Sequence, residues 1–295
     1  MTHSANGEIL NAEQIDFYHD QGYLVLENYL SDAIITAIRD EIRRLSVPAA
    51  SMTLSDDLID LEDSHSKDDP RIRRIKLPHK QSQIINDLLH SDTILAPARD
   101  LLGASIRLHT TKLNMKSPGY GAAIAWHQDF AFYPHTNDDV LAMAIIIDDM
   151  KTENGPLMVI PESHKGPIYD HHKDGVFVGG CTPEDAGFST QKAVSLTAPA
   201  GSISFHHGRI LHASAMNVSD SPRRLIFFEM MAADAFPIMG SMTKFESIDD
   251  YNKLLLCGQP TLTPRLADVP MRIPQPQPLA NKSIYEVQKS LTKER

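Results

Sequence analysis

The sequence predicts a mainly β protein with flanking α-helices, built around one antiparallel sandwich or barrel. Helical periodicity is confined to the first third of the chain. From residue 105 onward, short alternating segments follow one another, separated by Pro, Gly, Asn and Asp. Strands do not alternate with helices as they do in parallel α/β folds. We therefore expect one domain over 1–295, with N-terminal helices at 12–102, a β core at about 105–235 and a C-terminal wrap at 240–295.

The first third of the chain carries the signals of short helices. A capping residue, Asn11 or Asp32, precedes apolar residues that recur at helical spacing. These signals predict helices at 12–20, at 32–45 and, as two short helices, within 81–102. A strand is expected at 22–27, and the polar, acidic stretch 48–70 predicts a loop or mobile flap.

The rest of the chain has the alternation and punctuation of strands. The expected strands lie at about 105–115, 122–127, 140–148, 156–160, 193–197, 202–206 and 223–232. The Pro-rich stretch 240–282 contains one helix candidate, 248–256, and residues 283–292 predict a last helix.

Charge and composition limit the partners. Lys and Arg number 28 against 38 Asp and Glu, so the formal net charge is −10, which disfavours nucleic acids and anionic membranes. No apolar run approaches the ~20 residues that span a bilayer, and the N-terminus lacks the pattern of a signal peptide. Cys181 and Cys257 fit free thiols in a reducing compartment. We expect a cytoplasmic monomer or homodimer that acts on a small molecule.

Three His-x-Asp pairs raise the question of a metal site, because alternate residues of a strand lie on one face. The pairs are His90/Asp92, His172/Asp174 and His127/Asp129. The first lies between two predicted helices and the second lies in a polar loop. The third lies at the mouth of the predicted β core. A distant histidine added to this pair would complete the facial triad of a non-haem Fe(II) site.

A later segment, 201–214, offers the third ligand. It contains His206, His207 and His212, and sequence reasoning leaves the choice among them open. Arg223 begins an otherwise apolar strand eleven residues after His212, and a buried guanidinium requires an anion. Arg224 is its rival, since neighbouring residues of a strand face opposite sides. A dicarboxylate could bind the metal at one end and the arginine at the other.

These residues resemble the phytanoyl-CoA dioxygenase family of Fe(II)/2-oxoglutarate-dependent oxygenases over about 12–235. The resemblance is carried by three blocks: Trp126-His-Gln-Asp129 with Phe130-Ala-Phe-Tyr133, Asn154-Gly-Pro-Leu-Met-Val-Ile-Pro-Glu-Ser-His-Lys165, and His212-x-Ser214 followed by Arg223. The resemblance implies a double-stranded β-helix, the jelly-roll or cupin-like core. It also implies a role for each matching residue. His127, Asp129 and His212 match the iron ligands; Arg223, Ser214 and Asn114 match the contacts to 2-oxoglutarate.

The substrate pocket is less defined by the resemblance. Phe130, Phe132 and Tyr133 follow the His-x-Asp pair, and His171 lies in a loop expected near the mouth. Ile145 stands where the acyl-CoA branch of the family has a tryptophan near the cosubstrate. This difference favours a small metabolite over an acyl-CoA.

The resemblance therefore implies a dioxygenase that uses Fe(II), 2-oxoglutarate and O2. The enzyme would hydroxylate or otherwise oxidise an unactivated C–H bond and release succinate and CO2. Asp129 favours this chemistry over halogenation, since related halogenases have a small residue at that position. Two other classes remain as alternatives: a cupin-like metal-binding isomerase and a non-catalytic binding protein. Among oxygenases, the alternative is an acyl-CoA 2-hydroxylase.

Overall fold

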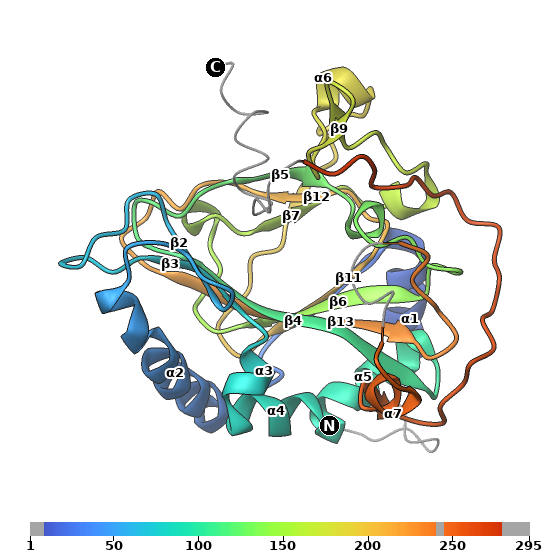
Figure 1. The fold of residues 1–295 in the computed structure, drawn as a ribbon, viewed down its shortest axis with the longest axis horizontal. Helices are drawn as coiled ribbons and strands as arrows, with labels where there is room; N and C mark the ends of the chain where they lie inside the picture. The colour runs from blue at the N-terminus through green and yellow to red at the C-terminus, as the bar shows by residue number, and fades with distance from the viewer. Residues whose placement is uncertain (1–8, 240–244, 279–295) are drawn as a thin grey trace.

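The computed structural model describes residues 9–239 and 245–278. Two antiparallel sheets face each other, and helices cover the outer side of the larger sheet (Figure 1). In sheet order, the larger sheet contains β1 (Tyr23–Leu26), β11 (Ile203–His207), β6 (Val140–Ile146), β13 (Arg223–Ala232), β4 (Ile106–Lys116), β3 (Ile72–Lys76) and β2 (Ile59–Leu61), with β14 (Leu255–Cys257) also paired to β4. The smaller sheet contains β10 (Val194–Ser195), β7 (Leu157–Val159), β12 (His212–Ser214) and β5 (Ile124–His127).

The helices at 12–21, 32–46, 83–89 and 92–102 form where capping residues and apolar spacing predict them, whereas the short helices at 78–81 and 183–186 were not predicted. In chain order, the helices are α1 (Ala12–Gln21), α2 (Asp32–Ser46), α3 (Pro78–Gln81), α4 (Gln83–Leu89), α5 (Asp92–Leu102), α6 (Pro183–Ala186) and α7 (Ile248–Asn252). Asn11 and Gln14 make a reciprocal capping box at α1. The cap of α2 is Ser31 and not Asp32, because the Ser31 side chain accepts the Ile34 N–H. Asp32 instead lies in the first turn, where a negative charge favours the helix.

Alternation along β13 divides the core into two layers. Ile226 and Phe228 point towards the helices and belong to the larger apolar core. Leu225 and Phe227 point between the two sheets, where they pack in a smaller cluster with Leu157 of β7. The direction of every side chain on this strand therefore follows from its parity. This parity also decides which charged residues reach the space between the sheets.

Several sequence predictions need correction. The stretch predicted as a loop, 48–70, contains a 3-10 helix (Val47–Ser51) and β2, and the sequence analysis missed β3. The consecutive residues Arg73 and Arg74 break the apolar–polar alternation of β3, which hid the strand pattern. The predicted helix 248–256 ends at Asn252 and is followed by β14. The predicted helix 283–292 lies outside the described residues.

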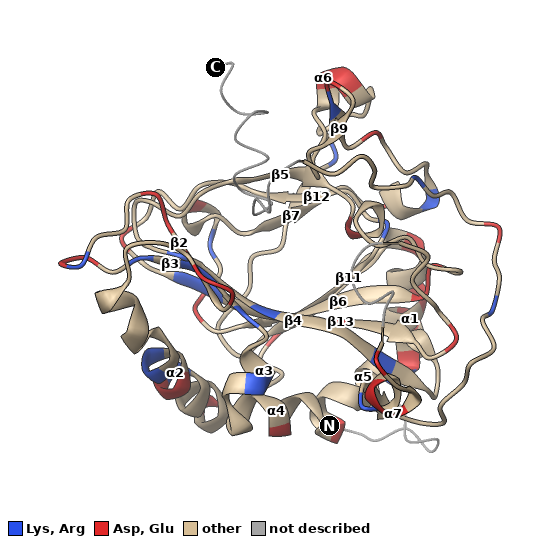
Figure 2. Cartoon of the chain, in the orientation of Figure 1, with Lys and Arg blue, Asp and Glu red and all other residues tan. Residues whose placement is uncertain are grey.

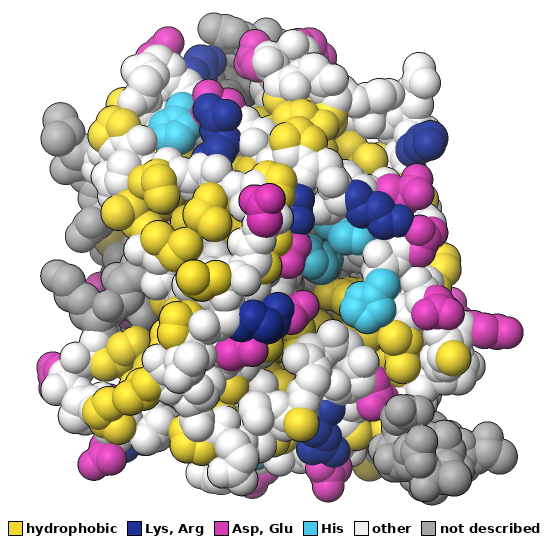
Figure 3. Space-filling view, turned by 90° about the vertical axis from the view of Figure 1, so that its right-hand side faces the viewer, with side chains coloured by type: hydrophobic (Ala, Val, Ile, Leu, Met, Phe, Trp, Pro, Cys, Tyr) yellow, Lys and Arg dark blue, Asp and Glu magenta, His cyan; other side chains and the backbone are white. Residues whose placement is uncertain are grey.

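Other features concern the surface. The loop after β7 contains a hairpin of β8 (His172–Lys173) and β9 (Val176–Phe177). The C-terminal segment crosses to this hairpin, where Phe177 N–H donates to the Pro276 carbonyl (Figure 1). Figure 3 shows acidic and basic side chains interspersed on one face of the molecule. Within the described ranges, no helix has the length and apolar character needed to cross a membrane.

Candidate metal centre and its cavity

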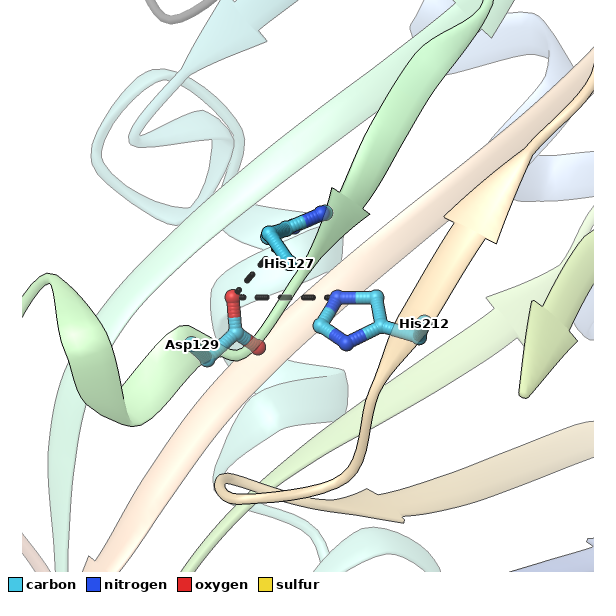
Figure 4. Close-up of side chains that lie close together, drawn as sticks. All are labelled: His127, Asp129 and His212. Atoms are coloured by element: carbon cyan, nitrogen blue, oxygen red, sulfur yellow. Dashed lines mark ion pairs between the residues drawn. The ribbon is translucent and has the colours of Figure 1, made fainter. Parts of the chain in front are cut away.

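Two histidines and one aspartate meet at the end of the smaller sheet. His127 ends β5, Asp129 begins a 3-10 helix (Asp129–Ala131), and His212 begins β12 directly opposite His127 in the strand register. Asp129 Oδ1 lies 3.9 Å from His127 Nε2 and 3.8 Å from His212 Nε2. All three side chains are buried, and their ligand atoms lie within 4.8 Å of one another (Figure 4). Sequence reasoning treated His127 and Asp129 as alternate residues of one strand, but β5 ends at His127, so the turn into the 3-10 helix positions Asp129. The pairing of β12 with β5 brings His212 to them.

This arrangement fits a divalent transition metal. His127 Nδ1 lies 2.8 Å from the Ala125 carbonyl and His212 Nδ1 lies 3.0 Å from the Ile210 carbonyl. Since a carbonyl only accepts, each Nδ1 carries the hydrogen and each Nε2 keeps its lone pair. Burial lowers the pKa of both imidazoles, which keeps them neutral. Two neutral nitrogens and one carboxylate on one side of a site suit Fe(II) and leave positions open.

Asp129 is held in its ionised form by its neighbours. Burial would raise the pKa of its carboxyl group, but His212 and His206 outweigh that effect and keep the pKa well below the usual range. His206 Nε2 donates to Asp129 Oδ2 at 3.2 Å. One carboxylate oxygen is thereby occupied by His206, and the other, Oδ1, faces the two triad histidines.

The structure separates the three candidate histidines. His212 joins the His127/Asp129 pair, whereas His206 contacts the outer oxygen of Asp129. His207 turns to the other side, where its ring lies 5.0 Å from that of His164 and its Nε2 lies 3.9 Å from Asp138 Oδ2. Adjacent residues of β11 therefore have opposite environments, as the strand period requires.

The two candidate arginines also face opposite sides. Arg223 shares its parity with Leu225 and Phe227, so it points between the sheets and is only 2% exposed. Arg224 points outward and binds Asp148 through Nε at 2.7 Å and Nη2 at 2.6 Å. Arg223 lies opposite Lys116 in the register, and its charge adds to burial in lowering the pKa of Lys116 to about 6.

The triad opens onto a cavity of about 440 Å³ between the sheets. Apart from the triad, the lining includes apolar side chains, histidines and charged groups: Asp57, Arg74, Lys76, Leu77, His109, Thr110, Thr111, Lys112, Asn114, Ile124, Phe132, Tyr133, Leu157, His206, Ala213, Ser214, Phe227 and Glu229. Ser214 and Asn114 both line this cavity, as expected for cosubstrate contacts. Ser214 Oγ is buried with no hydrogen-bond partner in the described part of the chain.

The predicted pocket residues divide into two groups. Phe132 and Tyr133 line the cavity, whereas Phe130, Ile145 and His171 do not, which corrects the expectation for those three. Phe130 packs in a separate apolar cluster. Ile145 lies on the helix-facing side of β6, in the larger core. His171 Nε2 accepts the Gln128 N–H at 3.0 Å, so the ring supports the loop behind the triad.

A charged network beside the triad escaped sequence reasoning. Glu229, buried on the inner face of β13, forms an ion pair with Lys112 and accepts a hydrogen bond from Tyr133 Oη at 3.2 Å. Burial raises the pKa of the Glu229 carboxyl group, while Lys112 opposes that shift. The available signal was a single glutamate in an apolar strand, which predicts an internal partner.

Comparisons with known proteins agree with this geometry. The model of the phytanoyl-CoA dioxygenase (PhyH) family matches residues 18–225. A probable alpha-ketoglutarate-dependent hypophosphite dioxygenase from Stutzerimonas stutzeri is 34% identical over 95% of this chain and 98% of its own length. An L-proline trans-4-hydroxylase from Streptomyces griseoviridis is 31% identical over 70% of this chain and 81% of its own length.

An ectoine dioxygenase from Nocardia farcinica is 30% identical over 75% of this chain and 77% of its own length. Among solved structures, EctD from S. alaskensis with bound Fe is similar, with a TM-score of 0.69 and 23% identity over 92% of this chain and 91% of that one. At this identity the structural match speaks for the fold alone.

Proposed function

The chain belongs to the phytanoyl-CoA dioxygenase family and is an Fe(II)- and 2-oxoglutarate-dependent dioxygenase, and we propose that His127, Asp129 and His212 hold its iron. The observation that carries this assignment is the meeting of three buried ligand atoms within 4.8 Å on the wall of a cavity. With iron, 2-oxoglutarate and O2 bound, such a centre couples conversion of 2-oxoglutarate to succinate and CO2 with oxidation of a substrate bond.

We further propose that the two sheets form a double-stranded β-helix within a single domain over 1–295. The strand orders β11-β6-β13-β4 and β10-β7-β12-β5 support it, because the strands alternate between the two sheets from β4 to β7 and again from β10 to β13. The N-terminal helices then act as an outer cover of the larger sheet. The C-terminal segment wraps the same unit.

Arg223, Ser214 and Asn114 are the proposed contacts to 2-oxoglutarate. Arg223 supplies a buried guanidinium, suited to the distal carboxylate of a dicarboxylic acid. It is not among the residues that line the cavity, but it lies on the same face of β13 as Phe227, which does line it. Ser214 and Asn114 line the cavity on β12 and β4, on the opposing sheets. An unpaired buried hydroxyl such as Ser214 Oγ favours a ligand that supplies its partner.

The remaining residues prepare the centre. The Ala125 and Ile210 carbonyls orient the two imidazole rings, and His206 occupies the outer oxygen of Asp129. Burial of this set keeps bulk water from the ligand atoms, which protects a reactive centre from side reactions. The polypeptide thus contributes orientation and exclusion of water.

The substrate is proposed to be a small molecule, oxidised at an unactivated bond. A cavity of about 440 Å³ must accommodate both cosubstrate and substrate, which disfavours the acyl-CoA 2-hydroxylase alternative. The relatives named for hypophosphite, ectoine and L-proline act on compounds of that size. Cys181 and Cys257 are both free, which supports a cytoplasmic location, and we propose a monomer or homodimer.

The test is anaerobic addition of Fe(II) and 2-oxoglutarate, followed by visible absorption and, with O2, by succinate release. We expect a metal-to-ligand absorption band in the wild type and its loss in His127→Ala and Asp129→Ala. His90→Ala, at the exposed His-x-Asp pair, is the matched control and should retain the band. Iron binding of normal affinity in both triad variants would remove the assignment. A metal-binding isomerase or a non-catalytic protein would release no succinate.

A further inference from the structure

Three cationic side chains gather on one wall of the cavity. Arg74 and Lys76 of β3 and Lys112 of β4 all line it, and the register puts Lys76 directly opposite Lys112. Ile75 and Leu113, which alternate with them, are buried on the helix side of the sheet. The three cations therefore share the inner face of neighbouring strands, which Figure 2 shows as blue segments on β3 and β4. We call Arg74, Lys76 and Lys112 the cationic wall.

This arrangement is unfavourable for the fold by itself. Like charges directly opposite each other on paired strands repel, and partial burial removes water from each ammonium group. Two buried carboxylates offset part of the repulsion: Asp60 Oδ1 lies 2.8 Å from Lys76 Nζ, and Glu229 pairs with Lys112. Where a sequence places unfavourable charges of this kind at the wall of a cavity, their usual role is to bind a ligand.

The side chain of Asn114 helps to position Arg74. Arg74 Nε donates to Asn114 Oδ1 at 3.0 Å, which fixes the plane of the guanidinium. An arginine fork held in one plane matches the paired oxygens of a carboxylate, phosphonate or phosphinate. The cationic wall therefore combines a preorganised fork with two ammonium groups that are held in ion pairs.

The cationic wall lies beside the metal ligands. Arg74, Lys76 and Lys112 line the same cavity as the triad residues His127, Asp129 and His212. Lys112 forms an ion pair with Glu229, and Glu229 accepts a hydrogen bond from Tyr133, which lines the same cavity. A small anion bound at the cationic wall would therefore keep the rest of its molecule close to the triad.

We propose that the substrate is a small molecule with an oxyanion group, a carboxylate, phosphonate or phosphinate, which binds the cationic wall and presents its oxidisable C–H or P–H bond to the iron. This inference rests on the proposed function. The reaction balances as R–H + O2 + 2-oxoglutarate → R–OH + succinate + CO2. R–H and 2-oxoglutarate each give up two electrons and O2 accepts four; one atom of O2 enters R–OH, the other enters succinate, and CO2 derives from the carboxylate that 2-oxoglutarate loses.

The direct test is calorimetric titration of the anaerobic protein loaded with Fe(II) and 2-oxoglutarate. The probes are hypophosphite, methylphosphonate and propionate, with the neutral compounds dimethyl methylphosphonate and propionamide as controls. At least one oxyanion is expected to bind with a Kd below about 1 mM, and the matching neutral compound is expected not to bind. The three anions distinguish phosphorus oxyanions from carboxylates.

Variants then locate the binding site. Arg74→Gln and Lys112→Met are expected to weaken the bound oxyanion by about ten-fold or more, since each removes a charge-assisted contact. Arg43→Gln and Lys253→Met change exposed residues outside the cavity and are expected to leave the Kd unchanged. A thermal melt of each variant establishes that it is folded.

Three results would overturn the inference while leaving the iron assignment intact. These are equal binding of a neutral compound, no oxyanion bound with a Kd below about 1 mM, and an equal weakening of 2-oxoglutarate binding in Arg74→Gln. The last result would assign the cationic wall to the cosubstrate. Failure of the proposed function looks different, because the wild type would then form no iron complex with 2-oxoglutarate before any probe is added.

Discussion

Replacing Arg223 by leucine tests the cosubstrate site most directly. The side chain is 2% exposed and points between the sheets, so water cannot easily replace a lost contact to a carboxylate. Removing one partner of a buried charged pair costs about 2–5 kcal/mol, which corresponds to a roughly 30- to 4,000-fold loss of affinity.

The neighbouring residue provides a matched control. Arg224→Leu removes the same charge from the same strand, but Arg224 binds Asp148 on the outer face. Its loss leaves Asp148 without its bidentate partner and is expected to lower stability, but it should leave the cosubstrate requirement unchanged.

The assay is the 2-oxoglutarate concentration that half-saturates the anaerobic absorption band, checked by succinate release. A half-saturating concentration raised at least roughly 30-fold in Arg223→Leu alone is expected. An unchanged value in that variant, or an equal rise in Arg224→Leu, would refute the assignment and the use of strand parity behind it.

Three further predictions follow from the same geometry. His206→Leu should weaken Fe(II) binding by about ten-fold, since it removes the hydrogen bond to Asp129 Oδ2, whereas His206→Gln should restore most of the affinity in a competitive chelator titration. Burial and a like charge lower the pKa of Lys116 from 10.5 to about 6, so the unfolded chain binds more protons between those values and stability should rise with pH. That rise should be smaller in Lys116→Met, measured by thermal melts from pH 6 upward. Phe228→Ala, in the larger core, should cost about 3–5 kcal/mol in urea unfolding, while Phe17→Ala at the surface should cost far less.

Part of the site could be predicted because it depends on local rules. His127 and Asp129 are two residues apart in the sequence. Arg223 begins an otherwise apolar strand, and a guanidinium that is buried in this way requires an anion. The mainly β character also follows from local alternation and turn residues, and the structure confirms it in two antiparallel sheets. None of these inferences needs knowledge of which strands are neighbours.

Other expectations failed where the answer depends on neighbours. Phe130 follows Asp129 directly in the sequence, and Ile145 lies on β6 of the larger sheet. Both side chains nevertheless pack in apolar clusters away from the cavity. β3 was missed because Arg73 and Arg74 interrupt the alternation of apolar and polar residues by which strands are recognised. Arg74 and Lys76 of this strand line the cavity. Their charged character has a reason only once the cavity is known.

The sequence by itself determined the chemical groups of this protein and the parity of each strand, because both are properties of neighbouring residues. Tertiary structure decided which groups meet. It chose His212 from three histidines by pairing β12 with β5, and it placed Lys112 opposite Lys76 by pairing β4 with β3. Hydrogen bonding between distant strands fixes these registers, and no local pattern encodes the choice of partner.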